Sequence, residues 1–188
     1  MLDDLFANIW QSLDKAQPSP FKLLQAATIG LDGTPKVRTV VLREASPEQH
    51  RVTFFTDKRS AKAAELQRNP CIALTGFDAA LHVQLRLEGV AALNTDDADI
   101  ARYWQACQAY NRVLYQSPVA PGTALSAPSD IQIKQEEHCA ASEDGYENFC
   151  VVQVSLAAVE WLSLSPEGYQ RAAFKRDGAT WAGHWIAP

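Results

Sequence analysis

Apolar side chains recur along the chain with two different periods, and each period predicts a kind of secondary structure. Residues 2–15 carry apolar residues at alternating steps of three and one, which places them on one face of a helix. From residue 21 onward the pattern changes to an alternation with period two, which predicts β-strands. The expected strands cover residues 23–31, 36–43, 51–57, 71–77, 81–93, 149–156, 159–165, 169–176 and 179–186.

Turn and cap signals indicate how the first segments are connected. Asp32-Gly33 lies between the first two strands and is a strong hairpin signal. An alanine-rich helix is expected over residues 58–69, with Asp57 as its cap. Antiparallel strands in this order, with helices inserted between them, predict an α+β fold built on a β-barrel.

The second half of the chain carries further helix signals. Asn94 or Thr95 is expected to cap a helix with an acidic first turn. The stretch 117–129 holds three prolines and predicts a loop. Ser129 and Gln132 then match a capping-box pattern, which predicts one more polar helix.

Composition and length place the chain among ordinary globular proteins. Hydrophobic residues make up 47% and charged residues 21% of its 188 residues. A chain of this length typically forms one domain with a sizeable core. The expected layout is a single domain over 1–188, with a helix at 2–15, barrel core at about 21–93 and 149–188, and a helical insertion at about 95–142.

Charge and hydropathy narrow the classes of partner. The 17 Lys and Arg residues against 22 Asp and Glu residues give a net charge of −5. This balance provides no basic surface for nucleic acid, and an anionic membrane would repel it. No apolar run reaches the length of a membrane span, and the start of the chain lacks the charged region of a signal peptide. We therefore expect a cytoplasmic protein whose function lies in a small-molecule site.

The cysteines give no metal-binding or catalytic pattern. No C-x-x-C occurs, so we expect no structural zinc and no metal site. His138 and Cys139 are neighbours, but adjacency in sequence is not the geometry of a cysteine–histidine dyad. The four cysteines are Cys71, Cys107, Cys139 and Cys150.

A possible anion site lies where the third strand meets the alanine-rich helix. Thr56 ends the strand, and Ser60 and Lys62 follow around the start of the helix. Arg38 shares its strand face with two apolar residues, so this face either ends at solvent or delivers a cation to an anion. The side chains of Arg38, Thr56, Ser60 and Lys62, with the N–H groups of the helix N-terminus, can together bind a phosphate. We call this group of residues the cradle. The alternative is a solvated turn whose charges keep it soluble.

The motifs of these segments resemble a known family in their order and spacing. RTVVLR, FFT, SAK, NP and QLRLEG occur in this order, and Glu160-Trp161, Arg171 and the terminal HWIAP follow. Together they resemble the FMN-binding split barrel of pyridoxamine 5′-phosphate oxidase and its relatives, over most of residues 21–188. Within that family the chain looks more like the divergent flavin-binding branch than the vitamin B6 enzyme.

The resemblance implies a fold, a cofactor and a partner. It implies a split β-barrel of antiparallel strands with peripheral helices. It also implies a homodimer with two FMN sites across its interface, and an oxidoreductase that passes a hydride from a small substrate to the flavin. The implied FMN contacts are Arg38, Thr39, Val40, Val41, Leu42, Arg43, Phe55, Thr56, Ser60, Lys62, Gln84, Ser129, Trp161 and Arg171.

Three of these positions also have ordinary structural interpretations. Gln84 offers a donor and an acceptor to the pyrimidine side of the flavin, but it could be a polar residue on a half-exposed strand. Trp161 could belong to the barrel core. Arg171 could place positive charge near the N1 edge of the ring, or pair with a surface carboxylate.

The chain departs from the family pattern at three positions in the expected FMN site. Ala61 stands where the family has an arginine, so one phosphate cation is absent. Pro128 stands where the family has a glutamine, and proline has no side-chain donor and no N–H. Arg43 replaces the usual lysine, which keeps the charge but changes the donor geometry. Most of the cradle remains, so we still expect FMN to bind.

The implied substrate site departs further from the vitamin B6 enzyme. That enzyme holds the substrate phosphate with Tyr, Arg and Ser from one helix, and adds an Arg and a His from its C-terminal block. The matching positions here read Tyr103, Cys107, Asn111, Glu167 and Tyr169. Only the tyrosine is kept, so we expect an uncharged or cationic substrate and inefficient oxidation of phosphorylated B6 vitamers.

Other function classes remain open at this point. The fold could hold flavin or haem without turnover, with a histidine as axial ligand. It could be a structural dimer whose site has decayed, or a genuine pyridoxamine 5′-phosphate oxidase. The histidines are His50, His82, His138 and His184.

Overall fold

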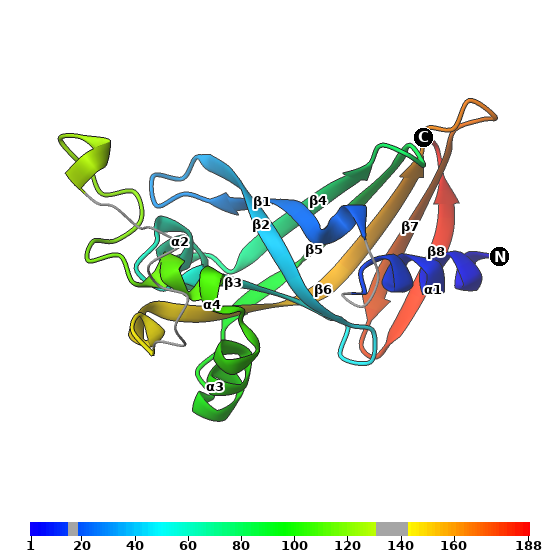
Figure 1. Ribbon diagram of the computed structural model, residues 1–188. Coiled ribbons are helices and arrows are strands. Elements are labelled where there is room, and N and C mark those ends of the chain that lie inside the picture. Colours follow the sequence, from blue (N-terminus) through cyan, green and yellow to red (C-terminus); the bar gives the residue numbers. More distant parts are fainter. Residues whose placement is uncertain (15–18, 131–142) are drawn as a thin grey trace.

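The chain forms a closed antiparallel β-barrel that continues into a flat extension of the same sheet (Figure 1). The computed structural model describes residues 1–14, 19–130 and 143–188. The strand order is β3-β2-β1-β4-β5-β6-β7-β8, and pairing of β3 with β6 closes the barrel. The barrel strands are β1 (Leu23–Ile29), β2 (Pro35–Ser46), β3 (Arg51–Asp57), β4 (Cys71–Asp78), β5 (Val83–Leu93) and β6 (Phe149–Ser163). This architecture confirms the predicted α+β split barrel.

Strand β6 belongs both to the barrel and to the extension. Its first half pairs with β3, and its second half pairs with β7 (Gln170–Asp177). Strand β8 (Thr180–Ile186) then adds the outer edge. The sequence predicted two separate strands at 149–156 and 159–165, and that prediction is wrong because one strand runs through both.

A β-bulge keeps β6 continuous. The register shifts between Glu88 and Gly89 on β5, so that Glu88 pairs with Ala158 and Gly89 with Leu156. Ala157 is therefore the extra residue of the bulge, which bends the strand without breaking it. Gly89 permits this close approach, since a Cβ there would lie 2.2 Å from the carbonyl oxygen of Ser155.

Replacing Gly89 with alanine is expected to destabilise the fold by about 3 kcal/mol, because the clash is with backbone that cannot yield. Gly33→Ala is the matched control. Its Cβ would meet nothing within 4 Å, and only the positive φ of 79° opposes it, at a cost of about 1 kcal/mol. Urea unfolding of both variants measures the difference, and equal losses would contradict the bulge argument.

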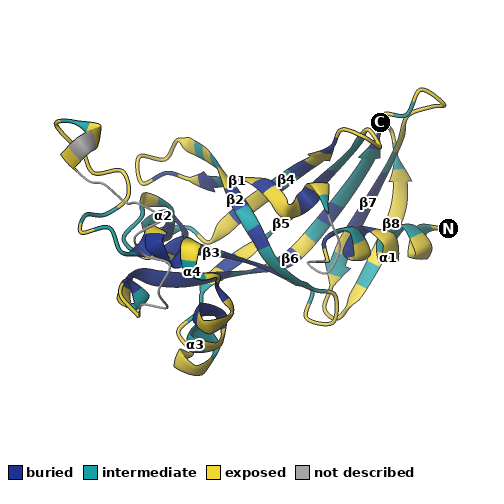
Figure 2. Cartoon of the chain, viewed as in Figure 1, coloured by how far each residue is buried: buried dark blue, intermediate teal, exposed yellow. Residues whose placement is uncertain are grey.

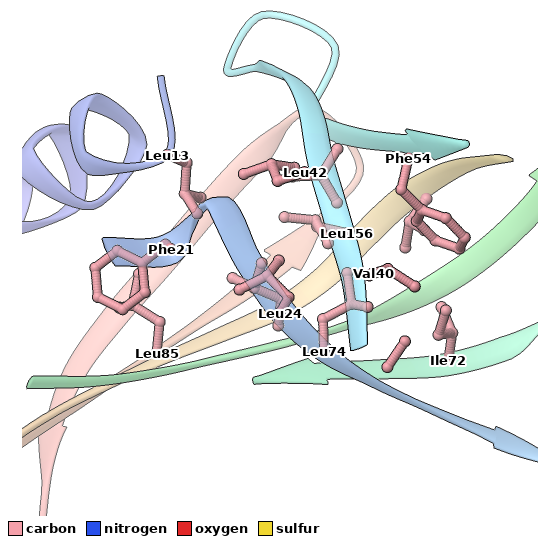
Figure 3. Close-up of a cluster of buried hydrophobic side chains, with 14 of the residues drawn as sticks. Leu13, Phe21, Leu24, Val40, Leu42, Phe54, Ile72, Leu74, Leu85 and Leu156 are labelled. Atoms are coloured by element: carbon pink, nitrogen blue, oxygen red, sulfur yellow. The ribbon is translucent and has the colours of Figure 1, made fainter. Parts of the chain in front are cut away.

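Alternating side chains fill the barrel with a hydrophobic core. On β5, Leu85 and Leu87 are buried while Arg86 and Glu88 are exposed, as the alternation predicted. Figure 3 shows Leu24, Val40, Leu42, Phe54, Leu74 and Leu156 meeting inside the barrel from different strands. Figure 2 shows the contrast with β8, where most residues are exposed.

Helix α1 (Leu2–Ser12) lies beside β7 and β8 (Figure 1). Phe6 contacts the rings of Phe174 and Trp181, with centroid distances of 4.8 and 5.0 Å. The helix ends at Ser12, three residues before its predicted end. Ile9 and Trp10, on the apolar face that the sequence predicted, are buried and join the main hydrophobic core.

Two predicted helix caps are wrong. The cap of α2 (Ala61–Arg68) is Ser60, whose hydroxyl accepts the N–H of Ala63, because the Asp57 carboxylate is bound by Arg59. The cap of α3 (Asp97–Ala106) is Asp96, which accepts the N–H of Asp99. In both cases the cap lies closer to the helix than the sequence pattern indicated.

The remaining described helices are short. α4 (Ala109–Arg112) follows α3, and the 3-10 turns are Pro20–Lys22, Val113–Tyr115, Pro128–Asp130 and Tyr146–Asn148. The polar helix predicted after Ser129 falls on residues 131–142, which lie outside the described residues. No helix in the described parts of the chain is long and apolar enough to cross a membrane.

Candidate functional site

The side chains predicted to form an anion site meet where β3 leads into α2. Thr56 is buried at the end of β3, and a tight turn brings the start of α2 above it. The Lys62 ammonium donates to the Thr56 hydroxyl, which lies 3.1 Å from the Ser60 hydroxyl. Three of the predicted phosphate ligands therefore converge within one strand–turn–helix segment.

Lys62 is a partly desolvated cation. Burial lowers the pKa of its ammonium, and the nearby Arg38 guanidinium lowers it further. Among the described residues, no carboxylate forms an ion pair with Lys62. Burial also raises the pKa of the adjacent Cys150 thiol to about 11, which keeps that thiol neutral. The segment thus offers positive charge and hydroxyls to an anion.

Arg38 lies at the same end of the barrel but already has an anionic partner. Its guanidinium donates to the Glu65 carboxylate at 2.7 Å and also to the Thr28 hydroxyl. The Glu65 side chain is only 4% exposed. Arg38 therefore contributes less net positive charge to the cradle than its sequence position indicated.

A cleft of about 710 Å³ opens on the outer side of β2 and β3, against α3. Arg43 and Phe55 line it from the strands, and Tyr103, Cys107 and Asn111 line it from the helical segment. Residues expected at the flavin and residues expected at the substrate thus meet in one cavity. Burial raises the pKa of the Cys107 thiol, so this side chain is an apolar, neutral part of the wall.

A bulge in β2 shapes this cleft. The register shifts between Leu42 and Glu44, which leaves Arg43 without a partner residue on β3. The Arg43 guanidinium lies over the Phe55 ring at 5.3 Å, and its Nε is buried without a hydrogen-bond partner in the described part of the chain. This buried donor is suited to a ligand acceptor, because an unsatisfied buried polar group is costly.

The same bulge brings Glu44, which sequence analysis missed, into the cleft. Regular alternation would put Glu44 on the core face with Leu42, but the bulge pairs it with Thr53 and turns it outward. There it accepts a hydrogen bond of 2.6 Å from the Tyr103 hydroxyl. Burial and this carboxylate both raise the pKa of Tyr103. No local sequence pattern predicted the bulge.

The predicted cofactor ligands Gln84 and Arg171 lie on the half of the sheet away from Thr56, Ser60 and Lys62. Gln84 on β5 and Arg171 on β7 both pair with Leu162 of β6, so they share one face. Arg171 donates to the Glu160 carboxylate at 2.6 Å, the carboxylate pairing considered as its alternative role. Tyr169 is 64% exposed and lines a separate hollow with Arg171.

Trp161 and Ser129 do not share the sheet face of Gln84 and Arg171. Trp161 pairs with Leu85 and packs against the hydrophobic core, with its ring 6.5 Å from that of Trp185. It therefore lies on the face opposite Arg171. Ser129 lies in the 3-10 turn Pro128–Asp130, and its side chain is outside the described part of the structure.

On β2, only some predicted contacts present side chains to the outside. Val40 and Leu42 are buried in the core, so only their backbone could meet a ligand, whereas Thr39 is exposed. Val41 is half-buried on the outer face.

The histidines give no ligand cluster. The Trp181 indole N–H donates to Nδ1 of His50 at 3.1 Å, and His82 occupies a turn with φ of 53°. His184 is exposed on the edge strand, and His138 lies outside the described residues. Across the described ranges, no group of three His, Cys, Asp or Glu side chains could hold a metal ion.

Comparison with known proteins gives a consistent family signal. A sequence profile described as "Pyridoxamine 5'-phosphate oxidase, FMN-binding domain" matches residues 4–95. A pyridoxine/pyridoxamine 5′-phosphate oxidase of Gluconobacter oxydans is 28% identical over 94% of this chain and 89% of its own. One of Pseudomonas fluorescens is 27% identical over 98% of this chain and 87% of its own.

Solved structures share the fold over nearly the whole chain. A pyridoxamine 5′-phosphate oxidase-related, FMN-binding protein of Nostoc punctiforme superposes with a TM-score of 0.77 and 25% identity, over 97% of this chain and 96% of that chain. PhzG of Burkholderia lata superposes with a TM-score of 0.75, over 98% and 91% of the two chains. At 18% identity, PhzG supports the fold alone.

Proposed function

Because the chain belongs to the pyridoxamine 5′-phosphate oxidase-like family of FMN-binding split barrels, we propose that it is an FMN-dependent oxidoreductase acting on a small substrate. The observation that carries the proposal is the convergence of Thr56, Ser60 and Lys62 at the N-terminus of α2. A desolvated ammonium, two hydroxyls and a helix N-terminus are the donors that a phosphate ester requires.

The cradle and the cleft each supply donors that suit a part of the cofactor. Lys62 and the hydroxyls of Thr56 and Ser60 would hold the phosphate. The β2 backbone at Val40–Arg43 would lie along the edge of the isoalloxazine ring. The unpartnered Nε of Arg43 would donate to a ring acceptor, while Phe55 supports the guanidinium from below. FMN, when bound, supplies the redox chemistry by accepting a hydride from the substrate. No side chain of the chain needs to transfer a proton for that half-reaction.

A second copy of the chain is part of the proposal. Thr56 pairs with Cys150, and Gln84 pairs with Leu162, twelve residues further along β6. At about 3.3 Å per residue, the two sets of ligands lie roughly 40 Å apart along the strand, far more than one FMN molecule spans. We infer that Gln84 and Arg171 would act on a flavin held by the cradle of another copy.

An exposed apolar sheet face supports this arrangement. On the outer face of β1, β2, β4 and β5, Leu23 is 54%, Val37 66%, Phe77 48% and Val90 51% exposed. Gln84 lies opposite Phe77 on the same face. Large apolar patches rarely stay open to water, and a homodimer would cover this one.

We expect a homodimer whose dissociation releases flavin, because each site would need both copies. Light scattering with simultaneous flavin absorbance measures both quantities on one sample. Val37→Glu, a charge placed on the apolar face, is expected to yield a colourless monomer. Lys175→Glu, on the exposed part of β7, serves as the control for added charge. A flavin-loaded monomer at micromolar concentration would contradict the prediction.

For the substrate, we propose an uncharged or cationic molecule. Glu44 places a carboxylate in the cleft beside Tyr103, and the neutral Cys107 stands where the vitamin B6 enzyme would have an arginine. An anionic substrate group would meet the Glu44 carboxylate there and lack the helix arginine, and the cations left to it in the cleft lining are Lys22, Arg43 and Arg102. The chain is on this basis an inefficient oxidase of phosphorylated B6 vitamers.

A further inference from the structure

A buried carboxylate lies next to the cradle, and the proposed function does not use it. Glu65 is on α2, one turn after Lys62, and is 3% exposed. The other buried residues of this helix, Ala63 and Leu66, are apolar. A glutamate this deeply buried is unusual unless it is paired, so its partners indicate its role.

The partners of Glu65 are a hydroxyl and one cation of the cradle. Its Oε2 accepts from the Thr28 hydroxyl at 2.6 Å and from Nη2 of Arg38 at 2.7 Å. Nη1 of Arg38 donates to the same Thr28 hydroxyl, which closes a triangle of hydrogen bonds. Arg38 and Glu65 also both act on the pKa of Lys62, so the three charges lie close together.

We propose that Glu65 is an internal counter-anion that sets how much negative charge the phosphate site accepts, and so determines its selectivity between FMN and riboflavin. This inference rests on the proposed function. Without flavin, Arg38 and Lys62 face Glu65, and the nearby Asp57 carboxylate is bound by Arg59. With FMN, the same two cations face Glu65 and a phosphate group that carries up to two charges.

The consequence is a site that holds the phosphate ester less tightly than its donors allow. Ala61 stands at the first position of α2, where the family pattern has an arginine, so the first turn of this helix sets only Lys62 against Glu65. The repulsion between the carboxylate and the phosphate acts in a partly desolvated region, where it is weakly screened. Riboflavin carries no phosphate and is not affected.

The test compares affinities for FMN and riboflavin, measured by quenching of flavin fluorescence, in wild type and in Glu65→Gln. Glutamine keeps the shape and the acceptor oxygen for Arg38 and Thr28 but removes the charge. We expect FMN to bind about tenfold more tightly to Glu65→Gln, with riboflavin affinity unchanged. Glu48→Gln, in the exposed turn between β2 and β3, is the matched control and should change neither affinity.

A second variant tests the same charge argument without touching the buried cluster. Ala61→Arg adds a cation at an exposed position of α2 and should also tighten FMN alone, by about fivefold. Wild type that prefers FMN to riboflavin, combined with no gain in FMN affinity in either variant, would overturn the role of Glu65 and leave the proposed function standing. Wild type that binds both flavins equally, or neither, would overturn the proposed function itself.

Discussion

Lys62→Ala is expected to weaken FMN binding by one to two decades while leaving riboflavin affinity unchanged. The ammonium is the cradle cation without a carboxylate partner among the described residues, and a charge-assisted contact of this kind contributes about 1.5–3 kcal/mol. Arg38→Ala is a poorer test, because it would leave the buried Glu65 carboxylate without its cation and destabilise the fold. Isothermal titration with both flavins measures the effect.

Lys36→Ala is the control for this experiment. Lys36 is a half-buried lysine on β2 whose ammonium pairs with Asp32 at the hairpin and forms no hydrogen bond to Thr56, Ser60 or Lys62 in the described part of the chain. Its loss should change neither flavin affinity. Equal FMN affinity in Lys62→Ala and wild type would contradict the position of the phosphate.

The lowered pKa of Lys62 predicts how FMN affinity changes with pH. The ammonium is charged below its pKa and loses its proton as the pH rises through that value. FMN affinity of wild type should therefore fall at a lower pH than an ordinary lysine would predict. Lys62→Ala should not show this alkaline loss, and riboflavin affinity should not follow it in either protein.

Turnover of pyridoxine 5′-phosphate and pyridoxamine 5′-phosphate is expected to be inefficient, with affinity at least about a hundredfold below that of a site with the arginine contacts. Cys107 and Glu167 stand where the family resemblance implies arginines, and each charged contact of that kind contributes about 1.5–3 kcal/mol. Glu44 adds repulsion inside the cleft. Steady-state assays at saturating FMN and oxygen measure the Michaelis constants.

A variant of the cleft tests whether the Glu44 charge raises these Michaelis constants. Glu44→Gln keeps a hydrogen-bond acceptor for Tyr103 but removes the charge, so it should lower the Michaelis constant for the phosphorylated vitamers several-fold. Glu48→Gln, outside the cleft lining, is the control. A micromolar Michaelis constant for either phosphorylated vitamer in wild type would show that the substrate argument is wrong.

The sequence by itself determined the features that depend on neighbouring residues. The hairpin at Asp32-Gly33 follows from the φ values that such turns require, and the alternation on β5 follows from the pleat of a strand. The cradle was predictable for the same reason, because Thr56, Ser60 and Lys62 lie within one strand–turn–helix segment of seven residues. Local geometry brings such residues together whatever the rest of the chain does.

Only the tertiary structure decided features that depend on pairing between distant strands. The bulge after Leu42 turns Glu44 from the core to the cleft, and its register is set by β3 rather than by the β2 sequence. Likewise, Glu65 meets Arg38 because α2 packs against β1 and β5 at the end of the barrel that Arg38 reaches from β2. A shift of one residue moves a side chain to the opposite face of a sheet, so the chemistry of this site depends on register, which periodicity within one strand does not specify.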